Sequence, residues 1–272
     1  MTEPTLYLLL AGLIGGFFAG FLGIGGGIIF ISILPFILSS IGISGHEVVQ
    51  YTIANSIFAT FFASFGANIT QIINKNFYLK QVLLIGVSGG LVGIFTLDFM
   101  VYSDWYTPIV FNWVIVLLLI YIMISTLRVA KRSQSYHDEG KHHNGWLITS
   151  GGFSGIIAAI SGLGGGIVII PILNSILAMN IKKAQSISLG VIFISSLILS
   201  IKNMLAETIH VYEYSIGYII FPVVLPLVIG VVLSAPLGVM AARRVASYIL
   251  SIIFAIFVFL LIGFKIYEIY GL

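Results

Sequence analysis

The chain has 272 residues, of which 59% are hydrophobic and 8% are charged, against about 25% charged residues in an ordinary soluble domain. With a mean hydropathy of +1.15, this composition excludes a soluble globular domain and indicates a polytopic membrane protein. The formal net charge of +3 argues against a nucleic-acid-binding surface, and the absence of cysteine excludes disulfides and thiolate metal ligands. The apolar runs are far longer than the roughly 10-residue strands of a membrane β-barrel, so the spans are predicted to be helices.

Eight apolar segments follow one another along the chain. They cover residues 5–39, 48–73, 79–100, 107–128, 146–179, 184–205, 213–241 and 246–270. The residues before the first segment include Glu3 and no lysine or arginine, so they lack the positive region of a signal peptide, and we expect the first segment to be retained.

A polar stretch, VAKRSQSYHDEGKHHNG at 129–145, divides the chain into halves of similar length. We interpret it as a basic linker between a first transmembrane repeat at 1–128 and a second at 146–272. Its histidines, His137, His142 and His143, are interpreted as part of a solvated loop rather than as a metal site.

The first and fifth segments carry nearly the same sequence. GGFFAGFLGIGGGIIFISIL at 15–34 corresponds to GGFSGIIAAISGLGGGIVIIPIL at 151–173, and glycine clusters interrupt the two copies at 23–27 and 162–166. Beyond the clusters the match is weak, and Gln50 aligns with Gln185 across a four-residue gap. A continuous helix over 5–39 would be about 52 Å long, against a hydrocarbon core of about 30 Å. Because consecutive glycines also weaken a helix interior, we expect each segment to break there and turn back.

The distribution of positive charge favours this topology. If segments one and five each crossed the membrane once, the 12 lysines and arginines would divide 8 against 4 between the two sides. If both are hairpins, 10 share one side and only Lys202 and Lys265 oppose them, as the positive-inside rule prefers. The prediction is an all-α polytopic membrane protein of two inverted repeats, each a glycine-broken helical hairpin plus three transmembrane helices. The linker is expected to be cytoplasmic and both termini outside, in the cytoplasmic (inner) membrane.

The glycine clusters also form the predicted binding site. Half-helices beginning near Gly27 and Gly166 would point unpaired N–H groups, with their partial positive charge, into the membrane interior. Glycine lets an anion approach such groups closely, and two facing tips would form a site near the midplane. No charged residue lies clearly at the centre of a span, so nothing marks a cation or proton path. Because nucleophilic triads, a dinucleotide fingerprint and metal-ligand clusters are also missing, we expect neither an enzyme nor a cofactor.

Packing is the competing interpretation for glycine in membrane helices. Gly12, Gly16 and Gly20 repeat every four residues, and this stripe is assigned to helix packing. Three polar residues of the second segment, Thr52, Ser56 and Thr60, share one helix face and suit a donor-rich path. The residues predicted to bind substrate are Gly23, Gly25, Gly26, Gly27, Gly162, Gly164, Gly165, Gly166, Thr52, Asn55, Ser56, Gln185 and Ser186, with Lys182 and Lys183 at the entrance.

The doubled motif, LGIGGG at 22–27 and GLGGG at 162–166, together with the chain length and the basic linker, resembles the TauE/SafE group, also called the toluene-sulfonate uptake permease family. The resemblance extends over the whole chain. It implies a secondary transporter of sulfur-containing anions such as sulfite, sulfonates or sulfoacetate, often in the export direction, with the motif glycines forming the substrate region. Ser32 in the first copy stands where the second has Pro171, so the two arms are not expected to be equivalent.

The resulting hypothesis is a secondary transporter of a small sulfur-containing anion, sulfite or an organosulfonate, that works by alternating access around two facing glycine tips. Its expected partners are the small anionic substrate and the lipid bilayer, with no nucleic acid; a coupling ion and a homodimer are left open. The alternatives are an anion channel with the tips as its filter, or a transporter of another small anion. An intramembrane enzyme and a passive subunit of another complex fit the sequence less well.

Overall fold

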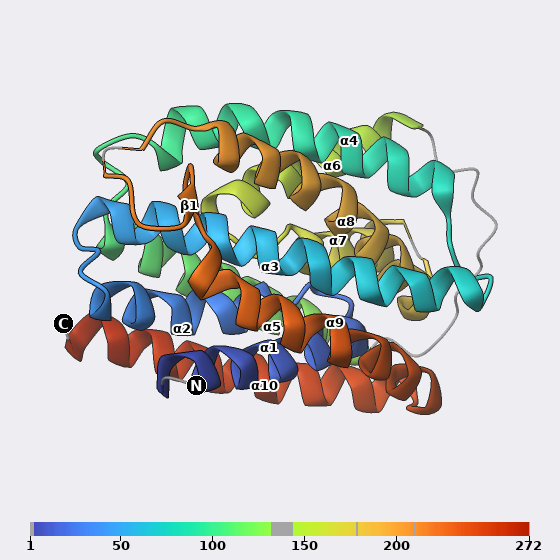
Figure 1. Ribbon diagram of the computed structural model, residues 1–272. Coiled ribbons are helices and arrows are strands. Elements are labelled where there is room, and N and C mark those ends of the chain that lie inside the picture. The colour runs from blue at the N-terminus through green and yellow to red at the C-terminus, as the bar shows by residue number, and fades with distance from the viewer. Residues whose placement is uncertain (1–2, 132–143, 178, 209, 272) are drawn as a thin grey trace.

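The computed structural model describes residues 3–131, 144–177, 179–208 and 210–271. In chain order the elements are α1 (Glu3–Leu22), α2 (Gly27–Ser40), α3 (His46–Ile73), α4 (Leu79–Thr96), the π-helical turn η1 (Leu97–Val101), α5 (Pro108–Lys131), α6 (Asn144–Ser161), α7 (Gly166–Pro171), the π-helical turn η2 (Ile172–Ile176), α8 (Ile181–Leu205), β1 (Ser215–Ile216), β2 (Ile219–Ile220), α9 (Phe221–Arg244) and α10 (Ser247–Gly271). The long helices lie side by side in one bundle, and the two short strands pair antiparallel at one end of it (Figure 1).

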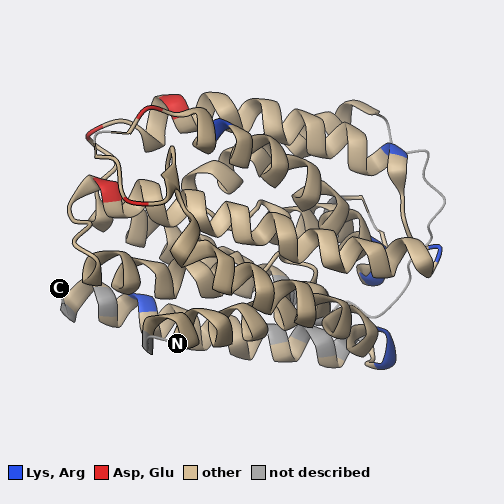
Figure 2. Cartoon of the chain, viewed as in Figure 1, with Lys and Arg blue, Asp and Glu red and all other residues tan. Residues whose placement is uncertain are grey.

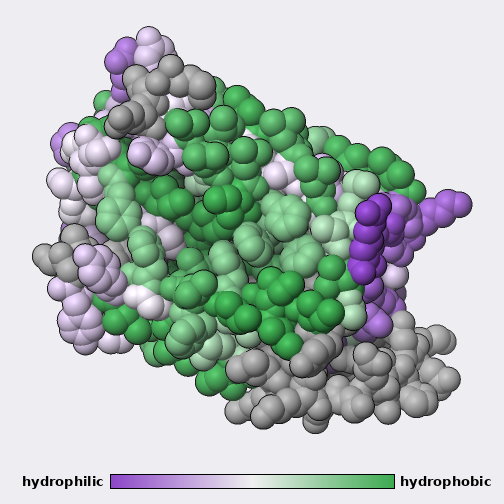
Figure 3. Space-filling view, turned by 90° about the horizontal axis from the view of Figure 1, so that it is seen from below, coloured by the Kyte–Doolittle hydropathy of each residue, from purple (hydrophilic) through white to green (hydrophobic). Residues whose placement is uncertain are grey.

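The fold is that of an all-α polytopic membrane protein, as predicted. Among the described residues, six helices are long and apolar enough to cross a membrane, and shorter apolar helices cover Gly27–Ser40 and Ala255–Tyr267. Spans α3 and α8 are the most buried, at 61% and 72%, so they form the centre of the bundle. The outer helices expose large apolar side chains to the surroundings, and Figure 3 shows them as a broad hydrophobic belt between two more polar ends.

The chain turns back at both glycine clusters. Between α1 and α2, Gly25 and Gly26 adopt left-handed backbone conformations, with φ of 84° and 73°, which an L-residue with a side chain rarely adopts. Phe30 of α2 then packs against Gly15 of α1, so the two helices run antiparallel and α2 ends near the end of the bundle where α1 begins (Figure 1). The second cluster repeats the turn between α6 and α7, with φ of 73° at Gly164. These are the predicted hairpins.

The stripe of small residues on α1 packs against α9, as predicted. A Cβ placed on Gly12, Gly16 or Gly20 would lie between 2.1 and 2.4 Å from an atom of the facing helix, so only glycine fits. The second hairpin repeats this arrangement, because Gly155 of α6 is in equally close contact with Gly89 of α4. Each hairpin therefore packs its first helix on the other half of the chain, and the halves share one core; the repeat boundaries stay predictions.

Helices α3 and α8 cross antiparallel at the centre. The amide of Asn68, near the end of α3, donates to the carbonyl of Leu189, in the first half of α8. An inverted repeat would place equivalent helices in this way, although the inverted relation itself stays a prediction. The second helices of the two hairpins differ after the positions where the first copy has Ser32 and the second has Pro171. Helix α2 continues to Ser40, whereas α7 ends at Pro171 and is followed by the π-helical turn η2.

Charged residues gather at the two ends of the bundle (Figure 2). At the basic end, the Lys182 ammonium donates to the carbonyl of Arg243, and Lys183 lies over the Tyr78 ring. The opposite end holds the acidic residues that the structure describes, and both termini point to this end (Figure 1). Residues 132–143 of the linker, with its histidines, lie outside the described residues.

Lys265 departs from the expectation. The sequence placed it with the charges at a membrane face, but the structure buries it completely within α10. It is therefore a charged residue in the apolar interior, and the hydropathy pattern did not indicate its burial.

Candidate functional site

The two glycine turns meet at the centre of the protein, between α3 and α8. A Cβ placed on either Gly25 or Gly164 would lie 2.7 Å from Cγ2 of the same residue, Thr60 of α3. Ile192 of α8 contacts both positions from the other side, at 3.1 to 3.3 Å. All ten residues of 23–27 and 162–166 are buried. The two turns thus lie against each other, and no side chain larger than hydrogen fits between them without displacing a neighbour.

Two serines connect the turns through their backbone carbonyls. Ser56 of α3 lies 2.8 Å from the carbonyl oxygen of Gly162 and 3.4 Å from that of Gly27, so its hydroxyl donates between the two turns. Ser188 of α8 bonds in the same way, at 2.8 Å to Gly23 and 3.2 Å to Gly166. Each serine therefore holds one residue of each turn.

The serine pair corrects the sequence alignment. Ser56 and Ser188 occupy equivalent places and are 132 positions apart, whereas Gln50 and Gln185 are 135 apart and are not equivalent. The residue equivalent to Gln185 is Ile53, since each contacts the first glycine of the opposite cluster. Ser188 was not among the predicted site residues; a gap of seven residues instead of four would have identified it.

Several buried donors in and beside the turns have no partner. Among the described residues, the N–H groups of Gly25, Gly26, Gly164 and Gly165 donate to no acceptor, and the hydroxyl of Thr60 is buried and also unpaired. An unsatisfied buried donor costs about 1–3 kcal/mol. The site therefore offers a set of hydrogen-bond donors suited to a small acceptor-rich ligand or to water, with glycine backbone accessible at close range.

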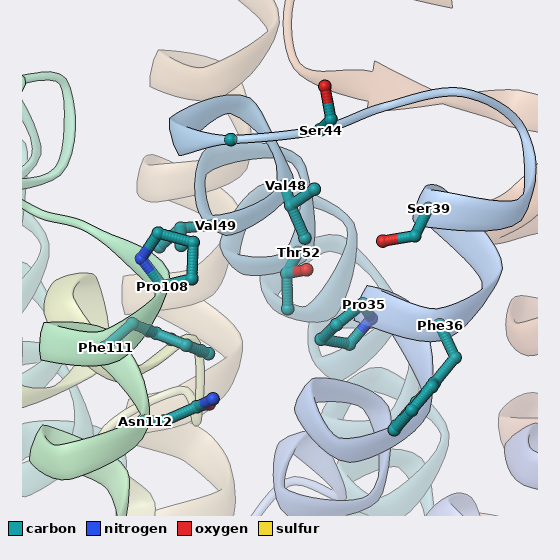
Figure 4. Close-up of a pocket in the computed structure, with 11 residues that line it drawn as sticks. Pro35, Phe36, Ser39, Ser44, Val48, Val49, Thr52, Pro108, Phe111 and Asn112 are labelled. Atoms are coloured by element: carbon teal, nitrogen blue, oxygen red, sulfur yellow. The ribbon is translucent and has the colours of Figure 1, made fainter. Parts of the chain in front are cut away.

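The polar face of α3 runs outward from the turns. Thr60 contacts both turns, Ser56 bonds to both, and Thr52 lies one helical turn further along. Thr52 does not reach the glycines. Instead it lines a cavity of about 340 Å³ between α2, α3 and α5 (Figure 4), where its hydroxyl is buried and unpaired.

The other predicted polar residues divide into two groups. The side chain of Gln185 packs against Gly23 and so belongs to the turn. Asn55 instead holds the strand pair, because its amide nitrogen donates to Tyr218 and its oxygen accepts from the N–H of Ile220. Ser186 donates to the carbonyl of Asn76 in the loop between α3 and α4, away from the turns.

The predicted entrance lysines lie at the basic end, in the first turn of α8. Lys182 and Lys183 are partly exposed there and contact Arg243 and Tyr78 respectively. The two lysines are not part of the central site, but they contribute to the positive surface at the basic end of the bundle. Among the described residues, no group of three or more histidines and carboxylates is placed to hold a metal ion.

A comparison with known families decides the classification. The family model "Sulfite exporter TauE/SafE" matches residues 8–265, nearly the whole chain. The chain belongs to this family. It is also 30% identical, over 248 residues, to a probable membrane transporter protein of Methanocaldococcus jannaschii; the match covers 88% of this chain and 86% of that protein. No solved structure matches the chain. Membership of TauE/SafE makes the chain a multi-pass membrane transporter and not an enzyme.

Proposed function

We propose that this chain is a secondary transporter of a small sulfur-containing anion, sulfite or an organosulfonate, across the cytoplasmic membrane. Transport would proceed by alternating access around the two glycine turns. The family description supports the class of anion. The basic end, with Lys182 and Lys183, would face the cytoplasm and attract the anion, and both termini would be outside.

The observation that carries the proposal is the meeting of the two glycine turns between α3 and α8, at Thr60 and Ile192. The N–H groups of Gly25, Gly26, Gly164 and Gly165 in these turns are buried and donate to no acceptor among the described residues. Oxyanions are strong acceptors, and in a site of low dielectric their charge is met effectively by such N–H groups. In the compact state described here the turns contact each other, so an anion would bind when they separate on one side.

Ser56 and Ser188 would stabilise the closed arrangement of the turns. Their hydroxyls bridge the turns in the state described here, and separation of the turns would free both hydroxyls to bind the anion. An exchange of one hydrogen bond for another costs little net free energy, which suits a site that must open and close repeatedly.

The test is uptake into proteoliposomes by the purified chain, with sulfite, methanesulfonate, sulfate and chloride as substrates. Gly165→Leu is expected to abolish uptake, because a side chain there would meet Ser154 and Ala158 and block the turn. Gly263→Leu on α10 is the matched control, since nothing lies within 4 Å of that position, and should transport normally. Thr60→Val removes only the unpaired hydroxyl and should reduce uptake while leaving the fold intact.

Two outcomes would contradict the proposal. Normal uptake by Gly165→Leu and Thr60→Val would show that the turns serve packing alone. Flux without saturation or counter-flow would favour the alternative of an anion channel that uses the turns as a filter, and flux of chloride alone would favour another small anion.

A further inference from the structure

The buried lysine of α10 is paired with a proline of α2. Pro35 lies inside α2 and has no N–H, so the carbonyl four residues earlier, that of Ile31, has no helical donor. Lys265 donates to this carbonyl at 3.1 Å. The same ammonium lies 3.3 Å from the amide oxygen of Asn112 on α5. A charge fully buried among the apolar helices of a membrane protein is costly, and in transporters such residues commonly mark the substrate path.

Lys265 determines how Asn112 presents its amide. Because the amide oxygen accepts from the ammonium, the amide nitrogen and its two N–H donors are directed away from Lys265. In Figure 4 this nitrogen is at the tip of the Asn112 side chain and points toward the side of the cavity where Pro35 lies. Lys265 also lies 5.7 Å from the centre of the Phe111 ring, another lining residue. The positive charge is therefore directly behind one wall of the cavity.

The cavity itself has the character of a binding site for a small organic molecule. Its volume of about 340 Å³ is in the range of small-ligand pockets, which are mostly apolar with a few polar groups. Apolar surface comes from Phe36, Val48 and Val49, and no acidic residue is among the described residues that line it. The hydroxyl of Thr52 is fully buried at the α3 wall without a partner, and in Figure 4 it points across the cavity toward α2.

We propose that this cavity binds a small organic anion. The oxyanion head would accept hydrogen bonds from the amide of Asn112 and the hydroxyl of Thr52 in the field of Lys265, and the short apolar body would pack on Phe111 and Pro35. The proposal rests on the proposed function, for which it supplies a first binding position at the end of the protein where both termini lie. Thr52 is one helical turn from Ser56, so the polar face of α3 connects this cavity with the glycine turns.

The experiment measures binding of methanesulfonate to the full-length protein in detergent by calorimetry, with neutral methanesulfonamide as the uncharged control. Wild-type protein should bind the anion and not the amide. Lys265→Met should weaken binding at least about tenfold, because it removes the positive charge behind the cavity wall and the donor that orients the Asn112 amide. Thr52→Val should weaken binding about two- to tenfold, because it removes one neutral hydrogen bond. Lys202→Met is the matched control: that lysine is at the same end, paired with Asp98 at 2.7 Å, and its loss should leave binding unchanged.

Binding that Lys265→Met and Thr52→Val both leave unchanged would overturn the proposal, as would equal binding of the neutral amide. Thr52→Val retains the buried lysine, so it tests the cavity even if Lys265→Met fails to fold. Displacement of the anion by dioleoylphosphatidylglycerol, with transport unaffected by either variant, would assign the cavity to a lipid headgroup and also overturn it. A protein that binds methanesulfonate here but transports no anion in liposomes would remove the proposed function and leave the cavity site.

Discussion

Thr60 should be coupled energetically to the glycines of both turns. An alanine at Gly25 or Gly164 places its Cβ 2.7 Å from Cγ2 of Thr60, which is shorter than the distances found between non-bonded carbon atoms in proteins. Thr60→Ser removes this methyl group and keeps the hydroxyl. The next contacts of the new Cβ are then atoms of Ile192, at 3.2 Å for position 25 and 3.1 Å for position 164.

The expected magnitudes follow from two separate costs. A left-handed conformation costs an alanine about 1–2 kcal/mol, and overpacking adds about 1–3 kcal/mol. Gly25→Ala should therefore lower the free energy of unfolding by about 2–5 kcal/mol. Gly42→Ala is the control for strain alone, because its φ of 92° is also left-handed and nothing lies within 4 Å. It should cost only about 1–2 kcal/mol.

The assay is a double-mutant cycle, with unfolding followed by circular dichroism in mixed micelles. In the Thr60→Ser background, Gly25→Ala and Gly164→Ala should each recover about 1–2 kcal/mol, whereas Gly42→Ala should recover nothing. Costs that add to within about 0.5 kcal/mol at all three positions would refute the reasoning, because they would show that the turns do not meet at Thr60.

Three further predictions concern the topology, the packing and the acidic end. Because the chain has no native cysteine, Ser44→Cys should be labelled by an impermeant maleimide in intact cells, and Asn76→Cys only after permeabilisation; the reverse pattern would invert the proposed orientation. Gly16→Ala should lower thermal stability by about 1–3 kcal/mol, since its Cβ would lie 2.5 Å from the α9 backbone, whereas Gly263→Ala should be neutral or stabilising; equal effects would contradict the α1–α9 contact. Burial, with smaller contributions from a neighbouring phenol and carboxylate, raises the pKa of Tyr102 above its ordinary value of about 10. The contribution of Tyr102 to stability is therefore present below about pH 10 and is lost as the pH rises toward the pKa of the folded state. Tyr102→Phe should therefore flatten the decline in stability measured by alkaline unfolding, and an unchanged decline would disprove this role.

The sequence predicted those features that depend on local chemistry and on overall charge. Glycine clusters specify where the helices break, and α2 and α7 begin at the predicted residues, Gly27 and Gly166. The positive residues indicated which ends of the helices lie together. Helix-face spacing grouped Ser56 with Thr52 and Thr60 on one face of α3, because a period of 3.6 residues does not depend on the partner helix.

Features that depend on register between distant helices were not predictable in this way. Ser188 reaches the turns only because α8 crosses α3 at a particular height, and a single sequence with an uncertain gap does not define that height. Lys265 looked like an end-of-span charge, since nothing nearby in sequence shows that Pro35, over two hundred residues away, leaves a carbonyl for it. Asn55 was assigned to substrate because the strand pair that engages its amide lies far along the chain.

The packing of α1 on α9, and of α6 on α4, bears on the order in which the chain folds during synthesis. The glycine face of α1 emerges first from the ribosome, but its packing surface on α9 begins only at Phe221, after most of the chain has been made. Until α9 has been made, only lipid or the insertion machinery can cover the glycine face of α1. A nascent chain stopped before α9 should therefore remain sensitive to proteolysis within the first hairpin, and full protection should arise late and in a single step.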